Sequence, residues 1–286
     1  MKTLFFGTSG FAVPSLHVAA AQTELFGVVT QPDRPSGRGH KVRATPVKTA
    51  ALGLGVRVFE PASLRAFARD IADRSFDLFL LASYGKILPK VLLDIPKLGA
   101  LNVHPSLLPK YRGATPIQTA LRNGDRRTGV TIMLMDAGMD TGDIVLQESL
   151  DIAPDEGYEA LHDRLAFYGG DLLGQAIDRA SRGALFATPQ SGERSVTRPL
   201  GKDDLVVDLT WPAQRIVNAV RAFSPKPAAR AEMHGEMVKL IRAHVSDDGG
   251  VVIDELIAPN RGRMSGKDFE RSARSTVRNR NEQEDD

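Results

Sequence analysis

The sequence predicts an α/β protein whose larger domain is a Rossmann-like, mainly parallel sheet. Short apolar runs alternate with segments of helical periodicity up to about residue 182, which is the βαβ order typical of parallel sheets. Several of these runs end in polar, glycine-rich segments, as expected where strands of such a sheet end. Beyond residue 204 the pattern changes to one helix followed by strand-like runs, which indicates a second, smaller unit.

The strands of the larger domain are predicted from runs rich in apolar and β-branched residues, namely Thr3–Phe6, Leu25–Thr30, Val56–Phe59, Leu78–Ala82, Ala100–His104 and Val130–Met135, and the segment Ile144–Leu150 belongs to the same domain. Helical spacing of apolar residues marks the segments between and after them, namely Val13–Ala21, Pro46–Ala51, Ser63–Ala72, Ala114–Asn123 and Tyr158–Arg182. An open α/β sheet binds its ligands beyond the carboxyl ends of its strands, so we expect the functional residues there.

The chain is predicted to divide into a catalytic domain over residues 1–188, a polar linker over 189–204 and a small domain over 205–271. The small domain contains a helical segment, Ala213–Phe223, and the strand-like runs Arg230–Met233, Val238–Val245 and Gly250–Ile257. Residues 272–286 carry many charges and few apolar side chains, so we expect them to be disordered.

Composition excludes several classes of site. The 286 residues include no cysteine, which rules out disulfides, thiolate metal sites and a cysteine nucleophile, and fits a cytoplasmic protein. No apolar stretch approaches the ~20 residues of a membrane span, and no cluster of His, Asp and Glu has metal-ligand spacing. We therefore expect neither a metal nor a membrane partner.

The most specific motif is LNVHPSLLPKYRG, which begins at Leu101. Asn102 and His104 alternate along one predicted strand, so both side chains project from the same face, and Pro105 ends the strand. Asp140 follows the next predicted strand in MDAGMDTGD, and we expect it at the adjacent strand end. Singly, such a histidine is most often structural and such an aspartate forms a turn.

Together these three residues predict a site for attack on a carbonyl group. A carboxylate can orient an imidazole and stabilise its charge, and an amide N–H can donate to a developing oxyanion. No serine elbow accompanies them, so the nucleophile is expected on the substrate, as in transfer of an acyl group to an amine.

Two other segments have weaker signals. Gly7-Thr8-Ser9-Gly10 lacks the G-x-G-x-x-G spacing and an acidic ribose partner, so a tight strand-to-helix turn is favoured over a nucleotide site. Residues 31–48 form a long loop with a cationic group at Arg34, Arg38, His40, Lys41 and Arg43. Charge alone leaves open whether this loop is merely solvated or contacts a phosphate backbone.

Three segments, NVHPSLLPKYRGATPIQ, QPDRPSGRG with PVK, and MDAGMDTGDI, together resemble the methionyl-tRNA formyltransferase family. The resemblance runs from Leu4 to about Gly183 and continues more weakly to Arg271. The N-x-H and Asp set is shared with other formyltetrahydrofolate-dependent enzymes, including sugar-amine and glycinamide ribonucleotide formyltransferases and folate-deformylating hydrolases. The basic loop is specific to fewer of these families, because it looks like the insertion with which the initiator-tRNA enzyme reaches the acceptor stem.

The resemblance implies roles for individual residues. Asn102, His104 and Asp140 would be catalytic. The co-substrate, 10-formyltetrahydrofolate, would be bound by Ser106, Leu107, Leu108, Pro109, Tyr84, Gly85, Ile87, Leu88 and Asp136. The acceptor, methionyl initiator tRNA, would be bound by Arg34, Arg38, His40, Lys41 and Arg43. The implied protein is a monomeric enzyme of translation initiation; the alternatives are a sugar-nucleotide N-formyltransferase and a non-catalytic RNA-binding protein.

The resemblance also implies an OB-like β-barrel at the C-terminus. The sequence between Val245 and Arg261 is short for the middle strands of a five-stranded barrel, so we expect an abbreviated or incompletely closed one. Ser224-Pro225-Lys226-Pro227 also stands where the family commonly has Asn-Pro-Trp-Pro, so an aromatic packing residue is missing.

Overall fold

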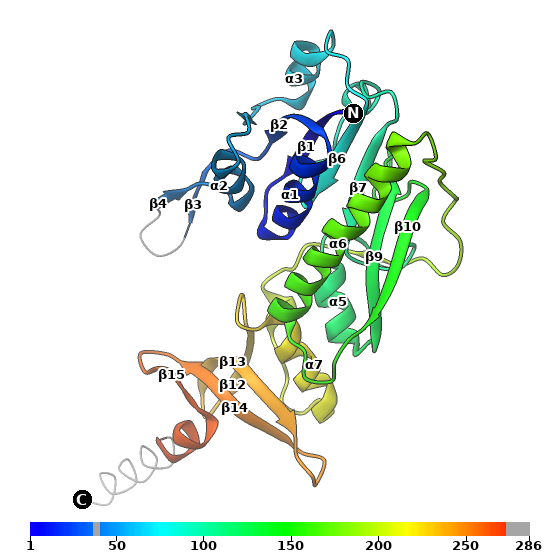
Figure 1. The fold of residues 1–286 in the computed structure, drawn as a ribbon. Helices are drawn as coiled ribbons and strands as arrows, with labels where there is room; N and C mark the ends of the chain where they lie inside the picture. The colour runs from blue at the N-terminus through cyan, green and yellow to red at the C-terminus, as the bar shows by residue number, and fades with distance from the viewer. Residues whose placement is uncertain (37–40, 273–286) are drawn as a thin grey trace, which may run out of the picture. The chain divides into compact units, whose positions relative to one another are not determined.

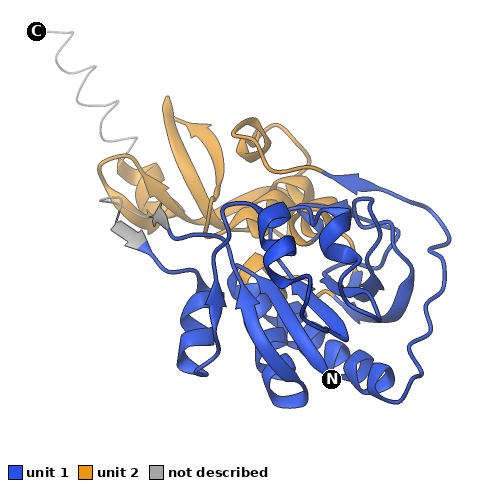
Figure 2. Ribbon diagram, turned by 90° about the horizontal axis from the view of Figure 1, so that it is seen from above, with its two compact units in different colours: residues 1–116, 127–151, 162–197 blue, residues 117–126, 152–161, 198–286 orange. Residues whose placement is uncertain are grey.

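The computed structural model describes residues 1–36 and 41–272, which divide into two compact units (Figure 2). Unit 1 comprises residues 1–116, 127–151 and 162–197, and unit 2 comprises residues 117–126, 152–161 and the chain from Arg198 onward. Residues 189–197 of the predicted linker belong to unit 1 in this division. The sequence-based boundaries were single cuts in a chain whose two units interleave, and they stay predictions.

Unit 1 is built on a seven-stranded sheet with the strand order β10-β9-β7-β6-β1-β2-β5 (Figure 1). Its strands are β1 (Lys2–Gly7), β2 (Glu24–Val29), β5 (Val58–Phe59), β6 (Leu78–Ala82), β7 (Ala100–His104), β9 (Arg127–Leu134) and β10 (Ile144–Asp151). The pairs from β5 to β7 are parallel, whereas β9 runs antiparallel to both β7 and β10. The predicted mainly parallel α/β sheet is therefore confirmed.

The predicted direction of one strand is wrong. The sequence predicts Asp140 at a strand end adjacent to that of the Asn102 strand, but in the antiparallel pair Leu134 at the end of β9 lies opposite Leu101 near the start of β7. The loop after β9 must therefore fold back to reach His104. An apolar run predicts burial of a strand and carries no information about its direction.

Helices connect these strands. Unit 1 contains the 3₁₀ turn η1 (Gly10–Ala12), the helices α1 (Val13–Gln22), α2 (Pro46–Gly53), α3 (Leu64–Ile71) and α4 (Lys90–Leu93), and α6 (Tyr158–Ser181) from His162 onward, whereas α5 (Pro116–Asn123) belongs to unit 2 from Ile117 onward. α6 approaches β7 closely where it carries Gly169, since a Cβ there would lie 2.7 Å from the Val103 side chain. Larger residues at this position would push the helix off the sheet that carries the site.

The core of unit 1 anchors the loop that follows β6. All five residues of β6 are buried, and Phe6, Phe79 and Tyr84 pack their rings together, with centroid distances from Phe6 of 5.3 Å and 5.6 Å. Tyr84 is the second residue after β6, so its burial fixes the start of a loop that was predicted to bind folate.

Two small sheets escaped prediction. β8 (Arg112–Gly113) pairs in parallel with β11 (Val196–Thr197), and β3 (Arg34–Ser36) pairs antiparallel with β4 (Lys41–Arg43). Two or three residues are too few to show a periodic pattern. In Figure 1 the β3–β4 hairpin projects away from the seven-stranded sheet.

Unit 2 contains a four-stranded antiparallel sheet in the order β12-β13-β14-β15. Its elements are the 3₁₀ turn η2 (Asp203–Leu205), α7 (Ala213–Phe223), β12 (Ala229–Met233), β13 (Glu236–Val245), β14 (Val251–Ala258) and β15 (Gly262–Ser265), and residues 266–272 are helical. α7 buries Ile216, Val220 and Phe223, and Ser224 at its end donates to the Ile241 carbonyl at 2.7 Å.

The small β-domain is thus confirmed, with four strands in the described part of the chain rather than the five of a full OB barrel. Residues 273–286 of the predicted tail lie outside the described residues. No helix within residues 1–36 and 41–272 has the length and apolar content needed to cross a bilayer.

Candidate active site

His104 and Asp140 meet at the carboxyl end of β7. Nδ1 of His104 lies 3.6 Å from Oδ2 of Asp140, and Nε2 lies 2.9 Å from the carbonyl oxygen of Tyr111. A carbonyl oxygen can only accept, so Nε2 carries a proton, and in the neutral ring Nδ1 is then the basic nitrogen. Because the imidazole is only 4% exposed, this basic nitrogen faces the carboxylate within the protein rather than in bulk water. In this tautomer Nδ1 is the ring nitrogen that can accept a proton.

Asp140 lies in a loop, and hydrogen bonds to backbone groups orient its side chain. Its Oδ2 accepts a hydrogen bond of 2.7 Å from the Gly113 N–H, and its own φ is +52°, a left-handed conformation unusual for a residue other than glycine. The preceding turn is closed by Asp136, whose carboxylate accepts from the Gly138 N–H at 2.9 Å and from the Thr141 hydroxyl at 2.7 Å. The Asp136 side chain, predicted to contact folate, therefore also shapes the Asp140 loop.

Asn102 completes the predicted set. It lies on β7 two residues before His104 and is half-buried, and its side chain makes no hydrogen bond within the described residues. A strand places residues i and i+2 on one face, so the amide is available on the side from which His104 projects. A free amide N–H next to a proton acceptor is suited to stabilise an oxyanion.

The segment Ser106 to Pro109 is predicted to help hold folate. Ser106 is fully buried and donates to the Lys110 carbonyl at 2.6 Å, and Leu108 and Pro109 are also buried. Thr131 of β9 accepts from the Leu108 N–H at 3.2 Å and donates to the Ser106 carbonyl at 2.6 Å. These side chains therefore brace the strand end from within, and their contact with folate stays a prediction.

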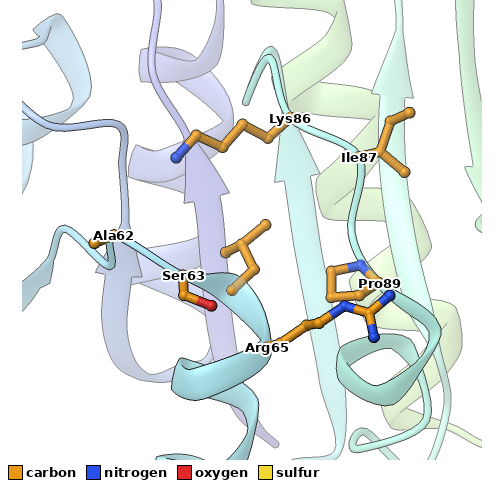
Figure 3. Close-up of a pocket in the computed structure, with 7 residues that line it drawn as sticks. Ala62, Ser63, Arg65, Lys86, Ile87 and Pro89 are labelled. Atoms are coloured by element: carbon orange, nitrogen blue, oxygen red, sulfur yellow. The ribbon is translucent and has the colours of Figure 1, made fainter.

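The loop after β6 borders a hollow of about 500 Å³ (Figure 3). Its lining comes from two segments, namely Ala62, Ser63, Leu64 and Arg65 at the start of α3 and Lys86, Ile87 and Pro89 in the loop. Ile87 is 80% exposed, whereas Tyr84 and Leu88 are buried. Arg65 and Lys86 form no ion pair with another described residue. The sequence predicted the loop but missed residues 62–65.

Tyr84 and Gly85 have structural partners of their own. The Tyr84 carbonyl accepts from the Thr8 hydroxyl at 2.9 Å and from the Gln31 amide at 2.8 Å, and a Cβ on Gly85 would lie 2.7 Å from that amide nitrogen. Burial raises the pKa of the Tyr84 phenol to about 12, so it stays protonated at neutral pH.

The basic loop is held at its base. Lys48 forms ion pairs of 2.8 Å with Asp33 and with Glu60, and the hydroxyls of Thr30 and Thr45 are 2.8 Å apart. The hydrogen bonds that Lys48 donates to the Asp33 and Glu60 carboxylates raise the pKa of Lys48, which therefore keeps its charge.

The cationic residues predicted on this loop are placed as follows. Arg34 begins β3, Lys41 begins β4 and Arg43 is an exposed residue at the end of β4, whereas Arg38 and His40 lie outside the described residues.

Sequence reasoning missed Gln190 and Ser195, which come from the predicted linker. The Gln190 amide group donates to the carbonyls of Asp140 and Gly142, and Ser195 accepts from the Tyr111 N–H at 2.9 Å. No sequence pattern marks them, because each is an ordinary polar residue in an irregular segment. Within the described ranges, no group of three or more His, Asp or Glu side chains could hold a metal ion.

Known protein families match the chain along most of its length. Residues 1–177 match the formyl transferase family, and residues 199–253 match the formyl transferase C-terminal domain family. A methionyl-tRNA formyltransferase of Geobacter metallireducens is 37% identical over 94% of this chain and 94% of its own length. That of a Roseiflexus species is 45% identical over 87% of this chain and 78% of its own length.

Solved structures share the fold at lower sequence identity. An N-formyltransferase from Helicobacter canadensis, in complex with folinic acid and dTDP-3-aminofucose, has a TM-score of 0.66 at 18% identity and covers 90% of this chain and 95% of its own. HypX from Aquifex aeolicus, in complex with tetrahydrofolic acid, has a TM-score of 0.66 at 17% identity and covers 94% of this chain and 46% of its own. At this identity the likeness concerns the fold.

Proposed function

The chain belongs to the methionyl-tRNA formyltransferase family, and from this premise we propose that it transfers the formyl group of 10-formyltetrahydrofolate to the α-amino group of methionyl initiator tRNA. The observation that carries the proposal is the meeting of His104 and Asp140, 3.6 Å apart at the end of the strand that carries Asn102. These groups can move a proton and stabilise an oxyanion while the attacking nitrogen comes from the substrate.

The proposed reaction assigns one role to each residue. The neutral amine forms a bond to the formyl carbon, and the Asn102 amide donates to the oxygen that gains negative charge. Nδ1 of His104 takes the proton that the amine loses, and Asp140 stabilises the resulting imidazolium. When the bond between the formyl carbon and N10 of the folate breaks, His104 returns the proton to N10. An α-amino group titrates near neutral pH, so most of the rate is expected from orientation and electrostatics.

The surroundings of the β6 loop fit a folate. A folate joins an aromatic body to a carboxylate tail, and the hollow beside the loop combines apolar Ile87 with the cations Arg65 and Lys86. We assign the body of the co-substrate to the predicted set of Ser106, Leu107, Leu108, Pro109, Tyr84, Gly85, Ile87, Leu88 and Asp136. The tail carboxylates are then expected near the two cations.

The acceptor is assigned to the basic loop. Its cations Arg34, Arg38, His40, Lys41 and Arg43 are suited to phosphates of a tRNA acceptor stem. The enzyme would act in the cytoplasm as a monomer and supply formylmethionyl-tRNA for translation initiation.

A formylation assay tests the proposal. Purified protein with the folate donor should convert methionyl initiator tRNA to formylmethionyl-tRNA and convert methionyl elongator tRNA more slowly. Two results would overturn it: turnover of a nucleotide-linked amino sugar with none of tRNA would identify a sugar enzyme, and tRNA binding without turnover would identify a binding protein.

A further inference from the structure

We propose that Gln190 is a positioning residue that fixes the backbone of the Asp140 loop, and thereby the carboxylate that faces His104; this rests on the proposed function. Gln190 lies on the segment between α6 and β11, fifty positions from Asp140 in the sequence. No prediction from the sequence assigned it a role.

The side-chain amide of Gln190 makes four hydrogen bonds, two donated by its nitrogen and two accepted by its oxygen. Its nitrogen donates to the carbonyls of Asp140 at 2.9 Å and of Gly142 at 2.8 Å. Its oxygen accepts from Nε and Nη2 of Arg112 at 3.1 Å and 2.7 Å. Turning the amide over would set its nitrogen against guanidinium donors and its oxygen against two carbonyls, so the chemistry of the neighbours determines its orientation.

The Asp140 loop needs such a tether because the sheet does not fix its position. β9 delivers the loop beside the start of β7, whereas His104 lies at the other end of β7. Asp140 also has a left-handed backbone conformation with φ of +52°, which is uncommon for residues other than glycine and which hydrogen bonds to the neighbouring backbone help to hold. The two hydrogen bonds from Gln190 hold the peptide group that directly follows Asp140 and the one that follows Gly142, so they fix the backbone on the C-terminal side of Asp140.

The same segment also holds the partner of His104. Ser195 accepts from the Tyr111 N–H at 2.9 Å and its carbonyl accepts from the Arg112 N–H at 2.9 Å, while the Tyr111 carbonyl faces Nε2 of His104. Gln190 therefore connects the Asp140 loop to Arg112, one residue after the group that orients the imidazole. The segment itself is fixed at Thr188, which exchanges backbone hydrogen bonds with Ile144 at 2.8 Å and 2.9 Å.

Two substitutions separate the donor role of Gln190 from its acceptor role. Gln190→Glu keeps an oxygen for Arg112 but cannot donate to the loop, and Gln190→Ala loses both functions. Both variants should lower kcat by about 10- to 100-fold, since misplacement of a reacting group by ~1 Å can cost ~10²-fold. KM for the folate and for tRNA should stay within about twofold, and the matched control Glu193→Ala, an exposed residue of the same segment, should behave as wild type. Wild-type kcat in Gln190→Glu would overturn the proposal.

A double-mutant cycle with Asp140→Asn identifies the group through which Gln190 acts. In the Asp140→Asn background, Gln190→Glu should change kcat less than about twofold, because the carboxylate that it positions is already gone. Multiplicative effects of the two substitutions would contradict this route. Melting curves of each variant show whether it is folded.

Hydrogen exchange tests the positioning role without reference to activity. Amides of residues 136–143 should exchange faster in Gln190→Glu than in wild type, while amides of β1 and β6 exchange unchanged. Unchanged exchange in the loop would overturn the proposal even if the wild type forms formylmethionyl-tRNA. A wild type inactive on tRNA would instead overturn the proposed function. The exchange rates of residues 136–143 would then still decide whether Gln190 fixes the loop.

Discussion

The catalytic cluster and the basic hairpin belong to the same unit but are held in different ways. In the catalytic cluster of Asn102, His104 and Asp140, the last two are held by distant parts of the chain. Asp140 accepts from Gly113 and its carbonyl accepts from Gln190, and Tyr111, whose carbonyl contacts His104, is held by Ser195. The hairpin is tied at its base, through Lys48 and the pair Thr30 and Thr45.

The difference corresponds to what each region must do. The rates of proton transfer and the strength of oxyanion stabilisation change when the distances between the groups change by a few tenths of an ångström. The catalytic groups must therefore be fixed before the substrate arrives. Attraction of a polyanion depends mainly on the number of charges and on ionic strength, so an arm fixed at its base suffices. Substitutions in the first region should therefore change kcat, and substitutions in the second should change KM for tRNA.

The largest effect is expected at His104. His104→Ala removes the proton acceptor and should lower kcat by about 10²- to 10⁴-fold, the usual contribution of general acid and base catalysis, while KM for tRNA stays near the wild-type value. Steady-state formylation kinetics measure both. His17→Ala, an exposed histidine on α1, is the matched control and should be fully active. A kcat for His104→Ala within tenfold of wild type would remove His104 from the mechanism.

The second largest loss of kcat is expected at Asn102. Asn102→Ala removes the amide that donates to the oxyanion and should lower kcat by about 10²- to 10³-fold, as for loss of one oxyanion donor in other enzymes. Asn102→Asp should be no better, because a carboxylate would repel the developing charge. Single-turnover rates at saturating substrates provide the comparison, and an active Asn102→Asp enzyme would argue against the oxyanion role.

A smaller and different effect is expected at Arg43. Arg43→Ala removes an exposed cation at the end of β4 and should raise KM for tRNA several-fold, leave kcat and KM for folate unchanged, and weaken the dependence of KM on salt. Arg179→Ala, an exposed arginine on α6, is the control for loss of surface charge elsewhere. A fall in kcat with unchanged KM would place Arg43 in the catalytic region instead.

The smallest effect is expected at Lys48. Lys48→Met leaves Asp33 and Glu60 facing each other without a cation, so the base of the hairpin should loosen and KM for tRNA should rise about two- to fivefold. The raised pKa of Lys48 means that its ion pairs persist below the ordinary value of 10.5 and are lost only as pH rises through the still higher folded-state value. The ratio of KM for tRNA in Lys48→Met to that in the wild type should consequently be constant between pH 6 and 9. A ratio that changes across this range would indicate that another titrating group controls the hairpin.

The sequence predicted the elements and the motif better than the contacts. Burial and periodicity placed β6, β7 and α7, and the spacing of Asn102 and His104 placed both on one strand, because these properties depend on neighbouring residues. The direction of β9 depends on how distant segments pair, and no local pattern contains it. Gln190 and Ser195 act through hydrogen bonds to backbone groups, which any polar residue in an irregular segment could make.

Single-turnover formylation of methionyl initiator tRNA by His104→Ala and Arg43→Ala, each over a range of tRNA concentrations, tests the division most directly. His104→Ala should be slow at every tRNA concentration, whereas Arg43→Ala should recover the wild-type rate once tRNA is saturating. If saturating tRNA restored His104→Ala, or if Arg43→Ala stayed slow at saturation, the separation of chemistry from recognition would be contradicted.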